Sequence, residues 1–321
     1  MKAIVFDGKL KNVKDYPTPG PGKGEALIRV HCAGICNTDL EIIKGYLGFR
    51  GVMGHEFVGV IKKANGKAQH LVGKRVVGEI NCGCGVCYYC LKGLQKHCPH
   101  RTTIGIAGKD CVFSEYVTLP AGNLWEVPDN VTDEEAVFIE PLAAAFEITK
   151  QVNIRPTDKI LVLGDGKLGI LSALVLNLTQ AVVTLVGKHE NKLRIAREQY
   201  INTVMLKKLE VAKQYDVVVE ATGSAEGIDL ALRLIKPRGT IILKTTVAQS
   251  RAMNLAPVVI DEVQVVGSRC GPFEPALRAL SRRLINVKPL ITAIYKVDES
   301  IEAFARAAQK ESLKVIIAFR P

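Results

Sequence analysis

Residues 159–169 read Lys-Ile-Leu-Val-Leu-Gly-Asp-Gly-Lys-Leu-Gly. The first five residues form a continuous apolar run, which is typical of a strand buried in a parallel sheet. Glycines follow at Gly-x-Gly-x-x-Gly spacing, and a helix is expected next, through Asn177. A strand that enters a helix through such a loop is the context in which this spacing indicates dinucleotide binding. The first glycine permits the tight turn, the second admits a pyrophosphate, and the third packs the helix on the strand.

The helix that follows this loop presents its N-terminal amides to the phosphates of a dinucleotide. We therefore predict that the loop residues contact the cofactor: Gly164, Gly166, Lys167, Leu168 and Gly169. Strands and helices alternate on from this point, with strands expected at 181–186, 216–220, 240–243 and 263–266. Alternation of this kind predicts a doubly wound parallel sheet of the Rossmann type. Thr222 and Gly223 follow one of these strands and are further predicted cofactor contacts.

The end of the second strand distinguishes NAD from NADP. An NAD site is expected to have Asp or Glu there, bound to the 2′-hydroxyl of the adenosine ribose. This chain has Gly187-Lys188-His189. The missing carboxylate and the cationic neighbours suit a 2′-phosphate, so the sequence favours NADP over NAD. The alternative is that Glu190 takes the acidic role while Lys188 points to solvent.

The first part of the chain has a different pattern. Short apolar or alternating runs at 2–6, 26–31, 58–61, 75–79 and 112–119 predict strands of an antiparallel barrel or sandwich. A helix is expected over 133–150, and the segment after Gly271 is too short to form a domain. We predict a mostly-β domain of residues 1–145 and 271–321, with a Rossmann domain of residues 146–270 inserted into it.

Six of the nine cysteines lie within thirty residues. Cys84, Cys87, Cys90 and Cys98 have the spacing of a closed tetrahedral zinc site, which is structural because no position is left for substrate. We predict this site in a lobe at about residues 81–100. Clustering in a chain with no export signal favours zinc over disulfides.

A second ligand set surrounds Gly54-His55-Glu56, with Cys36 upstream. A thiolate, an imidazole and a carboxylate brought together are the ligand types of a catalytic zinc. Taken singly, each residue has an ordinary structural explanation. Cys36 suits a small core position, and His55 suits a hydrogen-bonded loop.

Five features, in this order, resemble the zinc-dependent medium-chain alcohol dehydrogenases over essentially the whole chain. They are Gly34-Ile35-Cys36-Asn37-Thr38-Asp39, Gly54-His55-Glu56-Phe57-Val58-Gly59, the four-cysteine lobe, Glu140-Pro141-Leu142-Ala143 and the glycine loop. The resemblance implies an α/β protein with a GroES-like catalytic domain and a Rossmann domain.

The resemblance also assigns roles to residues. It implies that Cys36, His55 and Glu140 bind the catalytic zinc and that Glu56 is a carboxylate close to the metal. Asp39 would orient His55. Thr38 matches the hydroxyl that begins the proton relay. Glu41 stands where the family often has a histidine, which is a departure from the pattern.

The activity implied is hydride transfer between an alcohol (primary, secondary or polyol) and NAD(P)⁺, with an aldehyde or ketone as the product. Zinc lowers the pKa of the substrate hydroxyl. We expect two zinc ions per chain, and a homodimer or homotetramer by analogy with the family. An alternative is a zinc-independent quinone or enone reductase of the same fold.

The composition limits the remaining possibilities. Hydrophobic residues make up 48% of the 321 residues, and no apolar run reaches membrane-spanning length, so neither a membrane partner nor a signal peptide is expected. The net charge of +11 is scattered along the chain, and aromatic residues are few. A zinc-ribbon protein that binds nucleic acid is therefore disfavoured. We predict a cytoplasmic enzyme without a nucleic-acid partner.

Overall fold

The computed structural model describes residues 1–106, 108–246 and 252–319. The chain divides into two compact units, Met1–Glu140 with Ile291–Pro321, and Pro141–Leu290. By contacts, residues 271–290 therefore group with the second unit. The functional domain boundaries at 145 and 271 stay a prediction. No helix within the described residues is both long and apolar enough to cross a membrane.

The first unit is mostly β-structure. Its strands are β1 (Ala3–Phe6), β2 (Leu10–Val13), β3 (Glu25–Ile35), β4 (Gly51–Val52), β5 (Glu56–Ala64), β6 (Arg75–Gly78), β7 (Asn81–Cys82), β8 (Thr102–Ile104), β9 (Gly108–Lys109), β10 (Tyr116–Pro120), β11 (Leu124–Glu126), β18 (Ile291–Lys296) and β19 (Lys314–Ala318). Its helices are α1 (Asn37–Ile43), α2 (Tyr88–Leu91), α3 (Asp133–Ala136) and α10 (Ser300–Ala307).

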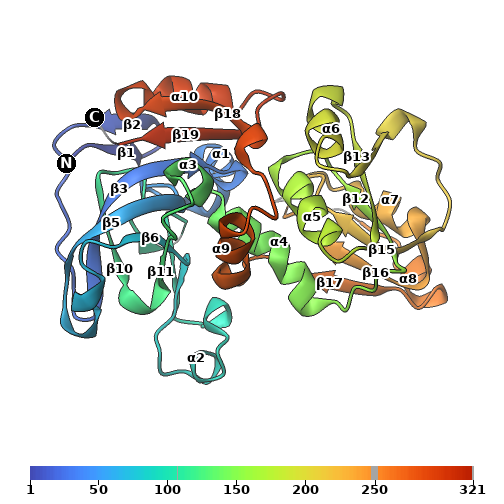
Figure 1. Ribbon diagram of the computed structural model, residues 1–321, viewed down its shortest axis with the longest axis horizontal. Coiled ribbons are helices and arrows are strands. Elements are labelled where there is room, and N and C mark those ends of the chain that lie inside the picture. The colour runs from blue at the N-terminus through green and yellow to red at the C-terminus, as the bar shows by residue number, and fades with distance from the viewer. Residues whose placement is uncertain (107, 247–251, 320–321) are drawn as a thin grey trace. The chain divides into compact units, whose positions relative to one another are not determined.

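The main sheet of this unit has the order β11-β6-β5-β3-β19-β18, and β10 also pairs with β3. The C-terminal strand β19 lies antiparallel to β3, with Ile316 opposite Gly34. Figure 1 shows β19 beside β3 in this unit. The tail thus completes the N-terminal sheet, as expected from its short length. The predicted strand 112–119 begins only at Tyr116, because the residues before it are bent and Ser114 makes only an isolated bridge to Ala3.

The second unit contains the predicted parallel sheet. Its strands are β12 (Lys159–Leu163), β13 (Val182–Gly187), β14 (Asn202–Met205), β15 (Tyr215–Glu220), β16 (Ile235–Leu243) and β17 (Gln264–Gly267). Its helices are α5 (Lys167–Asn177), α6 (Glu190–Arg197), α7 (Gly227–Leu234), α8 (Ala256–Ile260) and α9 (Phe273–Ser281). The order β14-β13-β12-β15-β16-β17 is that of a doubly wound dinucleotide-binding sheet. The predicted fold class is confirmed, although β14 was not foreseen.

The helix predicted over 133–150 is divided in two. Thr132 and Glu135 cap α3 reciprocally, and α4 (Ile139–Gln151) begins after a break at Val137 and Phe138. Pro141 explains the break, because it has no N–H to offer the carbonyl four residues earlier and its ring crowds that carbonyl. Glu140 therefore lies in the first turn of a new helix, where a carboxylate is electrostatically favoured.

Candidate active site and metal centres

Strand pairing brings Cys36 to His55 and Glu56. The ladder between β3 and β5 places Gly34 opposite Glu56. Cys36 directly follows β3, and His55 directly precedes β5, so both side chains emerge at the same end of this strand pair. Ligand atoms of Cys36, His55 and Glu56 all lie within 4.8 Å of one another. His55 and Glu56 are buried, and Cys36 is half-buried.

Asp39 holds two members of this group in place. Its Oδ2 accepts a 2.7 Å hydrogen bond from the backbone N–H of Cys36, which closes the first turn of α1. Its Oδ1 lies 3.5 Å from Nδ1 of His55. That distance is long for a hydrogen bond but close enough for charge attraction. Thr38 lies beside the same thiol, with Oγ1 3.7 Å from Sγ of Cys36.

The group stabilises positive charge. Burial alone would lower the pKa of His55, but the Asp39 carboxylate and the Cys36 thiol outweigh it and raise that pKa well above its ordinary value. Oε1 of Glu56 is buried, and no hydrogen-bond partner reaches it from the described residues. A buried carboxylate oxygen without a partner is costly unless a cation or donor binds it. A soft thiolate, an imidazole and this oxygen together fit a zinc ion.

The other carboxylate oxygen of Glu56 is paired with Lys314. The two side chains form a fully buried ion pair between β5 and β19. The Lys314 ammonium also lies 5.5 Å from the centre of the Phe138 ring. A lysine at this position was not foreseen from the sequence, because only the long-range pairing of β19 with β3 brings it to Glu56.

Glu140 is not among the described residues whose ligand atoms gather at 4.8 Å with Cys36 and His55. It is half-buried in the first turn of α4. The carboxylate that lies within 4.8 Å of both is that of Glu56. The role of Glu140 as third zinc ligand stays a prediction.

The four predicted cysteines of the lobe come together. Ligand atoms of Cys84, Cys87, Cys90 and Cys98 all lie within 4.8 Å of one another, and the sulfurs of Cys87 and Cys98 are 3.6 Å apart. A tetrahedral zinc with Zn–S bonds of about 2.3 Å requires sulfurs about 3.8 Å apart. The backbone N–H groups of Val86 and Cys87 lower the pKa of Cys84 to about 6. The arrangement fits a closed zinc site.

Cys82 and Cys111 belong to neither group. The amide of Asn123 lies 3.8 Å from the sulfur of Cys82. Burial raises the pKa of both thiols, so each is neutral at ordinary pH.

The glycine loop has the shape that a pyrophosphate needs. Gly164 has a φ of +116°, and a Cβ there would lie 2.4 Å from the carbonyl oxygen of Ala221. A Cβ at Gly169 would collide with the carbonyl of Gly164, whereas one at Gly166 would meet no described atom within 4 Å. Lys167 and Leu168 begin α5 directly after this open position. The loop therefore leaves room for a ligand at the helix N-terminus.

Thr222 and Gly223 lie at the end of β15, where Glu220 fixes them. The buried carboxylate of Glu220 accepts bonds from the Thr222 N–H at 2.8 Å and from the Thr245 hydroxyl at 3.0 Å. Oγ1 of Thr245 in turn accepts the Gly223 N–H. Glu220 is a support of this loop that the sequence pattern did not reveal.

A carboxylate lies at the end of β13 after all, and it belongs to Asp165. Its Oδ2 accepts the N–H groups of Lys188 and His189, both at 2.7 Å, and lies 3.0 Å from Nδ1 of His189. Beside it, Lys188, Met205, Leu206 and Lys207 line a cavity of about 250 Å³. The strand itself ends in Gly187, as the NADP prediction noted, but a carboxylate from the glycine loop lies beside its end.

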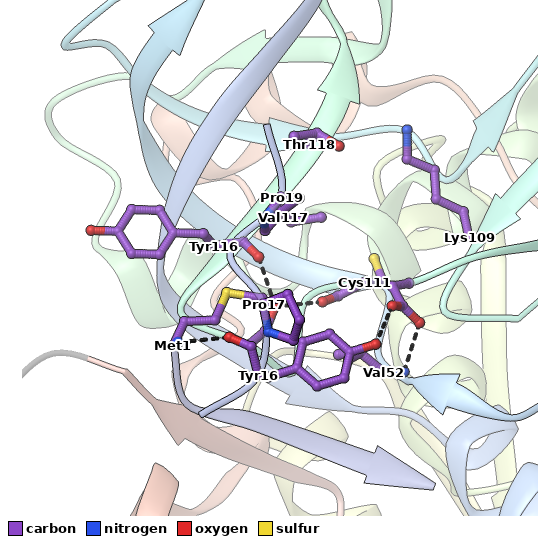
Figure 2. Close-up of a pocket in the computed structure, with 12 residues that line it drawn as sticks. Met1, Tyr16, Pro17, Pro19, Val52, Lys109, Cys111, Tyr116, Val117 and Thr118 are labelled. Carbon is purple, nitrogen blue, oxygen red and sulfur yellow. Dashed lines mark hydrogen bonds between the residues drawn. The ribbon is translucent and has the colours of Figure 1, made fainter. Parts of the chain in front are cut away.

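A further cavity, of about 400 Å³, lies in the first unit, and Figure 2 shows Tyr16, Pro17, Cys111 and Tyr116 around it. The Tyr16 hydroxyl donates a 2.5 Å hydrogen bond to Asp110, which raises the pKa of Tyr16 to about 12. None of the metal-binding candidates is among the described residues that line this cavity.

Comparison with known proteins agrees with this geometry. The family described as "Alcohol dehydrogenase GroES-like domain" matches residues 22–129, and "Glucose dehydrogenase C-terminus" matches residues 134–319. A sorbitol dehydrogenase of Halalkalibacterium halodurans is 29% identical and aligns over 95% of this chain and 94% of its own length. An L-threonine 3-dehydrogenase of Legionella pneumophila is 28% identical over 99% of both chains.

Solved structures show the same relationship. The alcohol dehydrogenase RspB of Escherichia coli, in complex with NADH, has a TM-score of 0.90 at 27% identity and covers 99% of both chains. A putative zinc-binding dehydrogenase of Sinorhizobium meliloti, bound to NADP, has a TM-score of 0.89 at 27% identity, over 99% of this chain and 98% of its own. The chain belongs to the zinc-type medium-chain alcohol dehydrogenase family.

Proposed function

We propose that this chain is a zinc-dependent dehydrogenase that oxidises an alcohol with NAD(P)⁺, and that its substrate is a polyol or a similarly substituted alcohol. The observation that carries the proposal is the gathering of Cys36, His55 and Glu56 in a buried group that stabilises positive charge. The substrate class is supported by the relatives named for sorbitol, arabinitol and L-threonine.

Cys36 and His55 would hold the catalytic zinc together with a carboxylate. Glu56 is the carboxylate within ligand reach, and Glu140 is the one that the family pattern indicates. When bound, the ion supplies Lewis-acid chemistry to the substrate oxygen and lowers the pKa of the substrate hydroxyl. Asp39 fixes the Cys36 backbone by a hydrogen bond and attracts the His55 ring, which favours the ligand geometry before substrate arrives.

Thr38 is positioned to take part in proton transfer. Its hydroxyl lies beside the Cys36 sulfur and is half-buried, so it can contact both a substrate hydroxyl and solvent. A threonine hydroxyl both donates and accepts hydrogen bonds, which is what one member of a proton relay must do.

The second unit would bind the dinucleotide. The pyrophosphate of the dinucleotide would lie over Gly166 at the N-terminus of α5. A Cβ added to Gly166 would have no described atom within 4 Å, so there is space for a ligand. The adenosine of the dinucleotide would approach the cavity that Lys188, Met205, Leu206 and Lys207 line at the ends of β13 and β14. Lys188 and Lys207 line that cavity and suit an anionic ligand. The preference for NADP over NAD stays a prediction, weakened by the carboxylate of Asp165.

We also propose a second zinc in the lobe, held by the four cysteine sulfurs, and association into a homodimer. β17 is an outer strand of its sheet, and Val265 on it is exposed. Val259 and Ile260, in the preceding helix, are exposed as well. An apolar outer strand is a natural place for a second copy to extend the sheet.

Zinc analysis together with a substrate panel tests the proposal. Wild-type protein should contain two zinc ions per chain and reduce NAD⁺ or NADP⁺ with polyols. Cys36→Ser should lose one zinc and lower kcat/KM by at least ~100-fold, because a ligand is removed from the reacting centre. Comparing Glu56→Gln with Glu140→Gln then shows which carboxylate retains the metal.

Cys32→Ser is the matched control, because Cys32 lies on β3, the strand that Cys36 follows, but outside both ligand groups. It should keep both zinc ions. Wild-type turnover in Cys36→Ser would contradict the catalytic-zinc assignment. A single zinc per chain, with turnover of quinones or enones, would favour the zinc-independent reductase instead.

A further inference from the structure

We propose that Asp165, from within the glycine loop, is the acidic residue that recognises the adenosine ribose and selects NAD over NADP. The inference rests on the proposed function, because it concerns the dinucleotide that this function requires. In dinucleotide-binding sheets the ribose is usually bound by an acid at the end of the second strand. Here that strand, β13, ends in Gly187, and the acid comes from the neighbouring loop.

The carboxylate of Asp165 occupies the space of the missing side chain. A Cβ built on Gly187 would lie 2.4 Å from both Cβ and Oδ2 of Asp165. Such a distance means that the two side chains cannot coexist. Gly187 is thus the residue that makes room for Asp165, whose carboxyl carbon lies 2.5 Å from the point where a side chain at position 187 would begin.

One oxygen of the Asp165 carboxylate is held by hydrogen bonds, and the other oxygen is not. Oδ2 is held by the N–H groups of Lys188 and His189 and lies against the His189 ring. Oδ1 makes no hydrogen bond within the described residues, and it is not among the fully buried atoms that lack a partner. Asp165 is 8% exposed overall. One oxygen of a rigid, nine-tenths buried carboxylate therefore still faces solvent and can accept a hydroxyl.

Glu190 does not fill this role. Its Oε1 accepts a 3.0 Å hydrogen bond from Arg197 on the outer face of α6, and both side chains are more than half exposed. The groups of the turn after β13 that contact Asp165 are the N–H groups of Lys188 and His189 and the His189 ring, none of which is acidic. Asp165 is thus the acid that a ribose at the end of β13 would meet.

The chemistry distinguishes the two cofactors. A ribose 2′-hydroxyl can donate a hydrogen bond to Oδ1, and bonds to an ionised acceptor are stronger than neutral ones. A 2′-phosphate has no proton to donate at neutral pH and would bring a second negative charge against the carboxylate. Lys188 and Lys207 attract either dinucleotide, so they raise affinity without deciding between the two.

Fluorescence titration of the purified enzyme with NADH and NADPH tests this assignment without relying on turnover. Wild-type protein should bind NADH at least ~10-fold more tightly than NADPH. Asp165→Asn keeps the side-chain shape and removes the charge, so the ratio of the two Kd values should fall by about tenfold. Asp216→Asn is the matched control, because its carboxylate also accepts a backbone N–H, from Lys159, in the same sheet. It should leave the ratio unchanged.

A modified dinucleotide tests the same contact on the wild-type protein, without a protein variant. 2′-Deoxy-NADH should bind wild-type protein several-fold more weakly than NADH, because it lacks the hydroxyl that Asp165 would accept. Equal affinity for NADH and NADPH, tighter binding of NADPH, or an unaltered ratio in folded Asp165→Asn would overturn the assignment. Failure of both dinucleotides to bind would instead overturn the proposed function and, with it, this assignment.

Discussion

At the scale of single residues, the buried pair of Lys314 and Glu56 places two charges in the interior of the first unit. Both side chains are almost completely removed from solvent. Two buried charges are tolerable only because each neutralises the other, and the Phe138 ring lies over the ammonium. Glu56 also lies within 4.8 Å of Cys36 and His55, so Lys314 holds one oxygen of the carboxylate beside these two proposed zinc ligands.

Lys314→Met should lower the free energy of unfolding by ~3–5 kcal/mol, because Glu56 is left as a buried charge without its cation. Urea denaturation measures the loss. The double variant Lys314→Met with Glu56→Gln should recover much of it. Lys2→Met is the control, because Lys2 pairs with Asp298 on the surface and should matter by less than ~1 kcal/mol. Equal effects of the two lysine substitutions would contradict this account.

At the scale of elements, the cysteine lobe exposes several of its large apolar side chains. The lobe consists of β7, α2, β8 and their connections, and its large apolar side chains Val86, Tyr88 and Leu91 are exposed. A segment that buries so little apolar surface requires a metal or disulfide for a defined shape. Described cysteines here form no disulfide, and their four sulfurs have zinc spacing.

Cys98→Ser should lose the lobe's zinc and lower the melting temperature by about 5 °C or more, because metal binding and folding of such a segment are coupled. Zinc content and thermal unfolding are the measurements. Cys82→Ser, in the same lobe but outside the sulfur group, should retain both zinc and stability. A Cys98→Ser protein with full zinc content would refute the structural site.

At the scale of the whole molecule, the net charge of +11 gives the protein a positive electrostatic field. A charge of this size favours binding of polyanions, and nucleic acid is one of them. Family membership and the shape of the glycine loop point instead to a dinucleotide, which carries two or more negative charges. A basic field raises the local concentration of such a ligand before any specific contact forms.

Dinucleotide binding should therefore weaken with salt. Raising KCl from about 0.01 M to about 1 M shortens the screening length from about 30 Å to about 3 Å, and the Kd of NADH should rise by roughly tenfold. Fluorescence titration across this range provides the measurement, and adenosine, which is neutral, serves as the control ligand. A Kd of NADH that is independent of salt would show that the overall charge has no part in cofactor capture.

Local patterns in the sequence were sufficient for the features whose residues are near one another in the chain. The glycine loop between β12 and α5 and the cysteine spacing of the lobe are of this kind, because a few consecutive residues determine both turn and ligand distance. The alternation of strands and helices likewise predicted the doubly wound sheet. The position of Pro141 was visible too, although its effect in dividing the helix was not anticipated.

Tertiary structure decided the features that depend on which strands pair and on which side chain fills a given space. The antiparallel register of β3 with β5 places Glu56 with Cys36 and His55, and β19 brings Lys314 to the same point from the far end of the chain. Asp165 fills the space that Gly187 leaves empty, so the acid that appeared to be missing from β13 is present. Sequence by itself determined which candidate metal-binding side chains and which loops this protein has. Only packing, through long-range strand registers and the exclusion of one side chain by another, decided which groups meet.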